Sequence, residues 1–427
     1  MDRSQYISPF MERYGTEKMR HIFSDKYRHN IWRELWYILA KAQHNLGANI
    51  TEEQLHEIDV ARYGDINYDK VIKYEKETRH DVVAHLIEFG DHCPTAKKIL
   101  HLGATSCYIT DNADILIMRD ALNEVYSRLC IVVEGLASYA KRYDDTPIVG
   151  KTHLQDAQLT TVGKRICMWI NDFALDLKMI ENTKNMLQML GCKGATGSQS
   201  SLYTLFGNDY LKVLQLDDII GKHFNMECMT ISGQTYTRKY DSMVANVLSQ
   251  IAQSASKMAT DIRLMSATGE MYESFGKNQI GSSAMPYKRN PITCEKVCGI
   301  ARHVICNSQN MAITASTQWL ERTLDDSSNK RIAMAELFLG ISEILNSLNK
   351  ITIGLTINTD LCIRNAEKHA KMASLEDDII RNVMAGGDRQ DAHKNAVWSN
   401  GSSNAEINTG FADKQVYKFL RENFLYD

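Results

Sequence analysis

Proline is scarce in this chain, and the places where it is absent constrain the fold more than any other feature of the sequence. The 427 residues contain only five prolines, at positions 9, 94, 147, 286 and 291. The stretch between Pro147 and Pro286 and the whole chain after Pro291 therefore lack the strongest helix breaker. This distribution favours long helices.

Three segments carry apolar residues at intervals of mostly three and four, which is the spacing of one buried face of a helix. Helices of about 25 residues or more cannot each bury such a face within one small domain, so they must pack lengthwise in a bundle that extends across subunits. The sequence therefore predicts an all-α oligomer. The three faces, here called the apolar seams, consist of Met118, Leu122, Val125, Leu129, Val132, Leu136 and Ala140; of Val244, Val247, Leu248, Ile251, Ala255, Met258 and Ile262; and of Met334, Leu337, Ile341, Ile344, Leu348 and Ile351.

The helical rhythm also indicates domain boundaries. It is interrupted near residue 105, within HLGATSCYITDN, and ends near residue 355. We expect an N-terminal helical domain over residues 1–104, a central long-helix bundle over residues 105–355 and a short C-terminal helical domain over residues 356–427. No repeat or Pro/Gly/Ser-rich linker separates them, which favours domains packed together.

Charge and composition exclude several classes of partner. A formal net charge of −3, with 24% charged residues, gives no general attraction to nucleic acid or to an anionic membrane. No apolar run reaches the roughly 18 residues of a membrane span, and the start MDRSQYISPF resembles no signal or transit peptide, so a cytoplasmic location is expected. The ten cysteines form no CxxC pair, which favours reduced core thiols over a zinc site.

Two polar stretches lie in the first quarter of the chain. Arg79, His80 and Asp81 combine charges that could bind an anion, although their residue types by themselves favour a solvated helix start. In HLGATS, at residues 101–106, Thr105 and Ser106 are placed to cap a helix beginning near Asp111. A helix start is also an anion site, so both interpretations of this stretch remain open.

A third polar stretch is GKTHLQDAQ at residues 150–158. Its GKT resembles part of a phosphate-binding loop, but the glycine required five positions earlier is Asp145 and no strand is expected before it, which excludes that motif. We expect His153 to open a long helix running towards Ile180. There it is either a surface cap or a general acid or base.

The fourth stretch is the loop 274–291, which ends in GSSAMPYKRNP. GSSAMPYKRNP alone contains two serines, two cations and two of the five prolines, and the segments that flank the loop are expected to be helical. A loop of this length is usually a lid, a binding loop or disordered. Apolar residues such as Ile280 and Tyr287 suit a lid that packs when it closes.

GSSAMPYKRNP, at residues 281–291, resembles the GSSxMPxKxN signature of the fumarase/aspartase superfamily, and its residue choices are similar to those of the adenylosuccinate lyase family. The resemblance covers roughly residues 10–395. Six further motifs agree in order: RHDVVAH at 79–85, HLGATS at 101–106, THLQDAQ at 152–158, KGATGSQ at 193–199, GQTYTRK at 233–239 and ERTLDDSSNKR at 321–331.

The resemblance implies a three-domain, mostly helical fold in which long helices of four subunits form a homotetramer core, with active sites drawn from three chains. It implies a carbon–nitrogen lyase of purine biosynthesis. The reaction is β-elimination of fumarate from adenylosuccinate, giving AMP, and from succinyl-aminoimidazole carboxamide ribotide, giving the carboxamide ribotide. No metal or organic cofactor is implied.

The resemblance also assigns roles to residues. Ser282 is similar to the general base of the family and His153 to its general acid. Because a serine hydroxyl has a pKa far above neutrality, its alkoxide needs stabilisation by a cation or by backbone N–H groups. Lys288 is the candidate cation, Asn290 is expected beside it, and His80 belongs with both the catalytic and the substrate-binding residues.

The implied substrate-binding shell supplies cations and hydrogen-bond donors for phosphate and carboxylate groups. At position 296 an arginine is expected, and Lys296 keeps the charge without the bidentate geometry. The shell consists of Arg13, Tyr14, Arg79, His80, Asp81, Thr105, Ser106, Gln234, Asn290, Lys296, Arg322, Ser327 and Arg331.

Two alternatives remain at this point. Another fumarate-releasing lyase, such as an argininosuccinate lyase, would share the superfamily signature, but KRNP and RHDVVAH favour a nucleotide substrate. A catalytically silent helical scaffold would keep the fold, but it would have no need of Ser282, His153 and Lys288 together.

Overall fold

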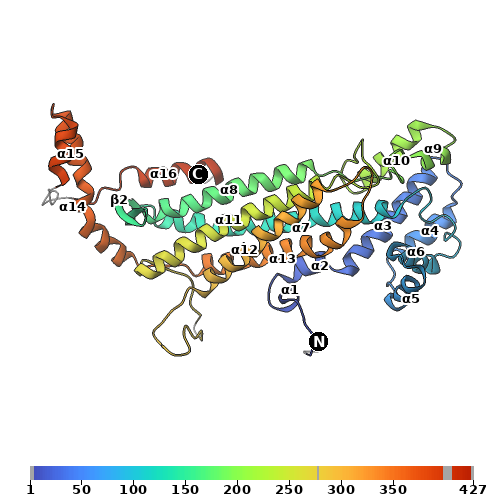
Figure 1. Ribbon diagram of the computed structural model, residues 1–427, viewed down its shortest axis with the longest axis horizontal. Coiled ribbons are helices and arrows are strands. Elements are labelled where there is room, and N and C mark those ends of the chain that lie inside the picture. The colour runs from blue at the N-terminus through green and yellow to red at the C-terminus, as the bar shows by residue number, and fades with distance from the viewer. Residues whose placement is uncertain (1–3, 277, 398–405, 425–427) are drawn as a thin grey trace. The chain divides into compact units, whose positions relative to one another are not determined.

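The computed structural model describes residues 4–276, 278–397 and 406–424, and these residues are mostly helical, as predicted (Figure 1). The strands form two short antiparallel pairs, β1 with β2 and β3 with β4. The helices are α1 (Pro9–Glu12), α2 (Glu17–Ile22), α3 (Asp25–Asn45), α4 (Glu52–Ala61), α5 (Tyr68–Thr78), α6 (Asp81–His92), α7 (Ser106–Arg142), α8 (Val162–Met186), α9 (Ser200–Leu205), α10 (Tyr210–His223), α11 (Lys239–Thr268), α12 (Ile292–Ser316), α13 (Asp325–Ile353), α14 (Thr359–Met384), α15 (Arg389–Val397) and α16 (Ala412–Phe424). The strands are β1 (Pro147–Thr152), β2 (Gln155–Thr161), β3 (Met271–Tyr272) and β4 (Thr356–Ile357).

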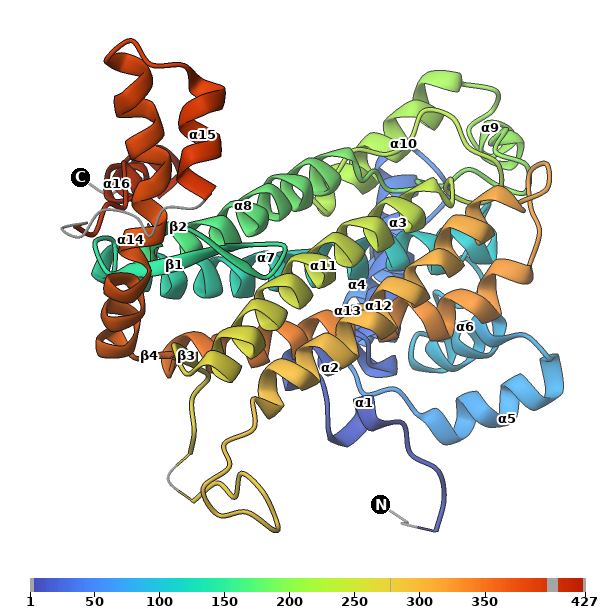
Figure 2. The same cartoon turned by 60° about the vertical axis from the view of Figure 1, so that its left-hand side comes forward.

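The chain divides into two compact units, and the division cuts through the long helices. Unit 1 comprises residues 1–125, 180–249 and 304–342, and unit 2 comprises residues 126–179, 250–303 and 343–427. Each unit therefore contains one end of α7, α8, α11, α12 and α13, which are marked in Figure 2. The three predicted sequence domains are a separate division and stay a prediction.

All three apolar seams are buried, which confirms the helical assignment of these segments. Every seam residue of α7, α11 and α13 is at most 6% exposed. In unit 2 the seams pack beside polar contacts between neighbouring helices: the Trp169 indole N–H of α8 donates to Asp261 Oδ2 of α11 at 2.6 Å. Lys296 of α12 likewise pairs with Glu343 of α13 at 2.7 Å. The bundle thus combines continuous apolar faces with a few paired polar groups.

The prediction of a helix beginning at His153 is wrong, because this residue lies in the turn of a β-hairpin. β1 and β2 pair antiparallel, and His153 and Leu154 connect them with φ angles of 53° and 59°. Two left-handed residues form a turn whose twist matches that of paired strands. Helix α8 begins only at Val162, where the Thr161 hydroxyl accepts a hydrogen bond from the Lys164 backbone N–H at 3.2 Å.

The start of α7 also differs from its prediction. The helix begins at Ser106, five residues before the expected start near Asp111. Thr105 therefore precedes the helix and Ser106 is its first residue. Within the described residues, no helix is both long and apolar enough to cross a membrane. All ten cysteines are free thiols, and six of them are buried.

Asp176, in unit 2, is a buried carboxylate with few polar partners. It is 4% exposed, and its Oδ2 has no hydrogen-bond partner. Burial is the main cause that raises the pKa of Asp176 to about 6, against a hydrogen bond from Ser254 that lowers it. Ionisation of this group therefore costs folding free energy at neutral pH.

Replacing Asp176 with Asn is expected to stabilise the chain at neutral pH. The folded chain keeps this proton between about pH 4 and pH 6, where the unfolded chain releases it, so stability falls as the pH rises through that window and stays lower above it. Asp176→Asn should gain little over the wild type at pH 4 and about 1–3 kcal/mol at pH 7.5. Urea unfolding at the two pH values measures this difference. The half-buried Asp172→Asn control should show a smaller change, and an equal gain at both pH values would contradict the assignment.

Candidate active site

The motif RHDVVAH begins at the corner between α5 and α6, in unit 1. Arg79 ends α5 in a left-handed conformation with φ 54°. His80 then caps α6, because its Nδ1 accepts a hydrogen bond from the Val83 backbone N–H at 3.4 Å. A neutral ring bonded in this way carries its proton on Nε2. That nitrogen lies 3.4 Å from Ser106 Oγ, at the start of α7.

Asp81 and Arg331 join the same corner to α13. The Arg331 Nη2 donates to Asp81 Oδ2 at 2.7 Å, and the arginine side chain is 68% exposed. Burial acts to raise the pKa of Asp81, but the Val82 backbone N–H and the Arg331 guanidinium outweigh it, so the pKa lies below its ordinary value. An exposed guanidinium held by one carboxylate keeps donors for an anionic ligand.

Gln234 lies where three further motifs meet. Its backbone N–H donates to the Glu321 carbonyl oxygen at 3.0 Å, and its Nε2 donates to the Ala195 carbonyl oxygen at 3.2 Å. Its Oε1 accepts from the Cys107 thiol, next to Ser106, at 3.6 Å. GQTYTRK, KGATGSQ and ERTLDDSSNKR therefore meet beside the start of α7.

Five of the seven motifs thus form one connected group in unit 1. The contacts run from Arg331 through Asp81 and His80 to the start of α7, and from there through Gln234 to Glu321 and its neighbour Arg322. This group, called the five-motif cluster below, comprises His80, Asp81, Ser106, Ala195, Gln234, Arg322 and Arg331.

Sequence reasoning missed a largely buried ionic network that joins the starts of α7, α11 and α13. Lys330 Nζ donates to Asp114 at 3.0 Å and to the Tyr236 hydroxyl at 2.7 Å, and it lies 3.4 Å from Asp241. Burial acts to lower the pKa of Lys330, but the two carboxylates outweigh it and raise the pKa above its usual value. The sequence contained a signal for Lys330, because this lysine lies in ERTLDDSSNKR, near the start of a helix that carries an apolar seam.

The signature loop lies in unit 2 and positions Ser282 by its own backbone. Ser282 Oγ accepts hydrogen bonds from the backbone N–H groups of Ala284 at 3.3 Å and Met285 at 3.1 Å. Two donors of this kind stabilise negative charge on the oxygen. Lys288 is exposed in the same loop, and its backbone N–H donates to the Met285 carbonyl oxygen at 3.1 Å.

The base of the loop is closed by two contacts. Asn290 Nδ2 donates to the Gly281 carbonyl oxygen at 2.9 Å, and Gly281 packs against the Lys288 carbonyl group. The buried Glu273 carboxylate accepts the first free N–H groups of α12, from Thr293 at 2.9 Å and Cys294 at 2.7 Å. Both ends of the loop are therefore anchored.

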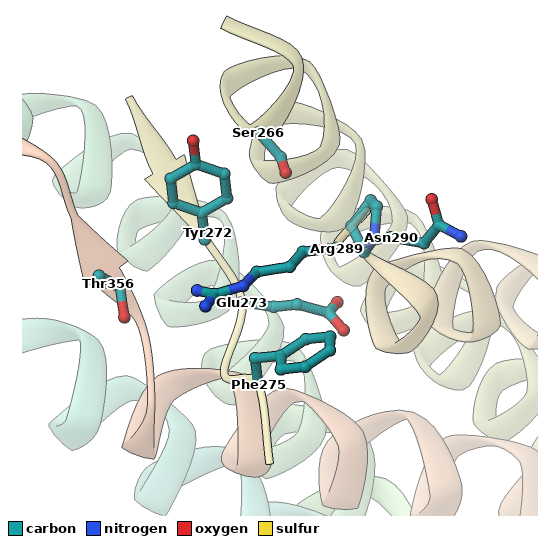
Figure 3. A pocket seen from close by; sticks show the side chains of 8 residues that line it. Ser266, Tyr272, Glu273, Phe275, Arg289, Asn290 and Thr356 are labelled. Carbon is teal, nitrogen blue, oxygen red and sulfur yellow. The ribbon is translucent and has the colours of Figure 1, made fainter. Parts of the chain in front are cut away.

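A cavity of about 150 Å³ lies at this base. Figure 3 shows the Arg289 side chain reaching across it toward Tyr272 and Thr356. The Arg289 guanidinium lies 5.3 Å from the centroid of the Phe275 ring, a cation–π distance. Asn290 and Glu273 also line the cavity, so it belongs to the anchorage of the loop.

The hairpin presents His153 at its exposed tip, also in unit 2. Strand β2 is held against α14, where the His369 ring donates from Nε2 to the Ala157 carbonyl oxygen at 2.6 Å, and Gln158 bonds to Glu376. Among the hydrogen bonds and ion pairs of the described residues, none joins His153 to Ser282 or Lys288. Within one chain these three predicted catalytic residues are therefore not connected.

Four other predicted residues make none of the contacts that define the five-motif cluster. Arg13 ends the short helix α1, and the Tyr14 carbonyl oxygen accepts from Arg20 at 3.2 Å. Ser327 lies half-buried in the first turn of α13. Lys296 lies in unit 2 and is engaged by the buried Glu343. These residues stay predicted binding residues.

Comparison with known proteins identifies the family. A family model described as "Lyase" matches residues 12–306. The adenylosuccinate lyase of Schistosoma mansoni is 39% identical over 424 residues, which cover 98% of this chain and 88% of that protein. The adenylosuccinate lyase of Saccharomyces cerevisiae is 40% identical over 92% of this chain and 82% of its own length. The chain belongs to the adenylosuccinate lyase family.

Relatives of this family extend to the archaeon Pyrococcus abyssi, whose adenylosuccinate lyase is 30% identical over 91% of this chain and 85% of its own length. Solved structures share the fold at lower identity. A fumarate lyase from Mesorhizobium superposes with a TM-score of 0.80 at 24% identity, covering 98% of this chain and 91% of that one. The 3-carboxy-cis,cis-muconate lactonizing enzyme of Pseudomonas putida gives 0.82 at 21% identity, covering 97% and 98%. The predicted superfamily fold is confirmed.

In a chain of the adenylosuccinate lyase family, Gly281 is a direct test of the loop geometry. A Cβ at Gly281 would lie 1.9 Å from the Lys288 carbonyl oxygen, so Gly281→Ala must open the base of the loop. We expect lyase activity to fall about a hundredfold, because a displacement of about 1 Å in a catalytic group costs that much.

Gly276→Ala in the same loop is the matched control. Its Cβ would meet only the Gln279 side chain, at 3.5 Å, so activity should stay near the wild-type value. Circular dichroism and gel filtration establish that both variants fold and assemble. Equal activity of the two variants would show that the loop base does not position the reacting groups.

Proposed function

We propose that this chain is an adenylosuccinate lyase of purine biosynthesis. It eliminates fumarate from adenylosuccinate to give AMP, and from succinyl-aminoimidazole carboxamide ribotide to give the carboxamide ribotide. The observation that carries the proposal is the 39% identity to an adenylosuccinate lyase across 98% of the chain. Two structural features also support the proposal: contacts join five of the motifs, and the signature loop is anchored at both ends.

The reaction needs a base that removes a proton from the carbon next to a carboxylate. We assign this role to Ser282. The two backbone N–H groups that donate to its Oγ support the assignment, because they stabilise the alkoxide that accepts the proton. Lys288 lies six positions later in the same loop and adds positive charge for the alkoxide and for the aci-carboxylate that develops.

An acid must protonate the nitrogen that departs, and we assign this role to His153. Its place at an exposed hairpin tip supports the assignment, because the ring can enter a site formed by another chain. His153 and Leu154 are in a left-handed conformation, which is strained for residues other than glycine. Such strained residues cluster at functional sites, which supports a catalytic role for His153.

The anionic groups of the substrate need cations and N–H donors. The five-motif cluster offers Arg322 and Arg331, the Gln234 amide and the ring of His80, and we assign it to substrate binding. We place His80 in contact with the reacting groups. The remaining predicted binding residues complete this shell. Arg79, Thr105 and Ser327 come from motifs of the cluster, and Arg13, Tyr14, Asn290 and Lys296 come from other segments.

We infer that the complete site forms in a homotetramer with three helical domains per chain. Five motifs are connected in unit 1, and the motifs of His153 and Ser282 lie in unit 2, which fits a site completed by neighbouring chains. Helix α8 supports assembly, because it exposes Met168, Leu175 and Met179 by 49%, 55% and 38%. Intervals of seven and four residues place these side chains on one helix face, which a second chain can cover. A cytoplasmic location and the absence of a cofactor stay predictions.

The purified protein is expected to convert adenylosuccinate to AMP and fumarate. The reaction is followed as the change in purine absorbance when the succinyl group leaves. Argininosuccinate, tested in parallel, should not be turned over. A folded tetramer that acts on argininosuccinate alone would overturn the proposal, and one that acts on neither substrate would favour a silent scaffold.

Ser282→Ala and His153→Ala should each lower kcat at least about a hundredfold without loss of assembly. Ser283→Ala, at the neighbouring exposed serine, is the matched control and should retain most of the activity. If Ser282→Ala stayed near the wild-type rate, the base would be another residue.

Mixing the two inactive variants under subunit exchange tests the shared site. Some sites in the mixed tetramers would combine an intact Ser282 with an intact His153 from different chains, so activity should return. Failure to recover any activity after proven exchange would place both residues of one site on the same chain.

A further inference from the structure

Arg238 is a buried arginine that none of the roles above uses. It immediately precedes α11 and is 3% exposed. Its Nη1 and Nη2 donate to both oxygens of Asp111, at 2.9 and 3.3 Å, and its Nε donates to Asp326 Oδ2 at 2.6 Å. Its guanidinium also lies over the Tyr236 ring, 4.4 Å from the centroid. One side chain therefore fixes the starts of α7 and α13 to the start of α11.

Asp326 connects Arg238 to the five-motif cluster. Its second oxygen, Oδ1, accepts from Arg322 Nη1 at 2.8 Å. Asp326 is 1% exposed, whereas the Arg322 side chain is 22% exposed. The carboxylate thus lies between a buried guanidinium and one that reaches the surface. The orientation of Arg322 depends on where Arg238 holds Asp326.

Asp111 connects Arg238 to Gln234 in a similar way. Its Oδ2 also accepts from the Tyr236 backbone N–H at 3.1 Å, two residues after Gln234. The Gln234 backbone N–H in turn donates to the carbonyl oxygen of Glu321, which precedes Arg322. The two binding residues are therefore cross-linked to each other, and both are tied to carboxylates that Arg238 holds.

The charge of Arg238 also keeps Arg322 available to a ligand. Arg238 and Arg322 together offset Asp111 and Asp326. Without the Arg238 guanidinium, two buried carboxylates would face Arg322 as their nearest cation among these four residues. A buried unpaired charge is strongly unfavourable, so Arg322 would move inward. Its N–H groups would then bond to Asp111 and Asp326 and would no longer be available to a substrate.

We propose that Arg238 is a positioning residue for substrate binding. It does not contact substrate, but it holds Asp326 and Asp111 so that Arg322 and Gln234 present their donors to an anionic group of the substrate. The inference rests on the proposed function, which assigns Arg322 and Gln234 to the substrate. It adds a residue that neither the motifs nor the resemblance had assigned.

Arg238→Lys is the primary test. Lysine keeps the charge but cannot reach both carboxylates with a planar fork. We expect KM for adenylosuccinate to rise about tenfold or more with kcat within about threefold, since the lost interaction is made equally before and during the reaction. Asp326→Asn is a second variant with nearly the same volume, and it should raise KM in the same way.

Two comparisons separate positioning from a general loss of structure. Arg33→Lys is the matched control, because Arg33 is 2% exposed in unit 1, pairs with Glu88 at 2.8 Å and also donates to backbone carbonyl groups. It should lower the unfolding midpoint and leave KM unchanged. In a double-mutant comparison, Arg238→Lys combined with Arg322→Lys should raise KM by less than the product of the two single effects, because only the effect that passes through Gln234 is left to add.

Binding of adenylosuccinate to the Ser282→Ala protein, measured by calorimetry, keeps the result independent of turnover. If the wild type lacked turnover but Arg238→Lys weakened this binding, the proposed function would fail and the positioning role would stand. An unchanged Kd and KM in Arg238→Lys, or multiplying effects in the double variant, would overturn the positioning role. No binding to the parent protein would overturn both proposals.

Discussion

A helix as long as α7, α11 or α13 must keep one face apolar and buried along its whole length. This constraint determines where the polar, reactive motifs can lie. A charged side chain within a seam would lose its hydration without a partner, so the reactive motifs occupy the segments where the seams stop. THLQDAQ precedes α8, GQTYTRK runs into α11, the signature loop precedes α12, and ERTLDDSSNKR spans the start of α13. Starts of helices carry unsatisfied N–H groups and positive potential, which suits a substrate with phosphate and carboxylate groups.

The buried charges show how such polar regions remain stable beside the seams. In unit 1, Arg238 and Lys330 each contact two carboxylates, so each of these four carboxylates has a cationic partner while the network fixes three helix starts. The opposite case occurs in unit 2, where Asp176 has one buried oxygen without a partner and holds its proton more tightly. A cationic partner therefore favours a buried charge as a fixed support, although burial still raises the pKa of Asp241, which pairs with Lys330.

Several features could be predicted from the sequence because they depend on local pattern. The apolar seams could be predicted because a buried helix face repeats at a fixed spacing, and every seam residue is indeed buried. Motif order was sufficient to indicate the family. The hairpin at His153 could not be predicted. Turns with two left-handed residues usually contain glycine or asparagine, and this turn consists of His153 and Leu154. Arg238 was missed although it lies inside GQTYTRK, because an arginine in a sequence resembles a solvated one until its two carboxylate partners, more than eighty residues away, are known.

The sequence by itself determined the long helices, the apolar faces that they bury and the set of motifs available for chemistry, since each depends on residues that are neighbours along the chain. Only the tertiary structure decided that five of the motifs form one connected cluster, that Ser282 Oγ receives two backbone N–H groups, and that His153 lies on a hairpin tip. These outcomes depend on contacts between distant segments. The free energy of such contacts depends on burial, on charge pairing and on loop closure, and none of these is fixed until the seams have packed.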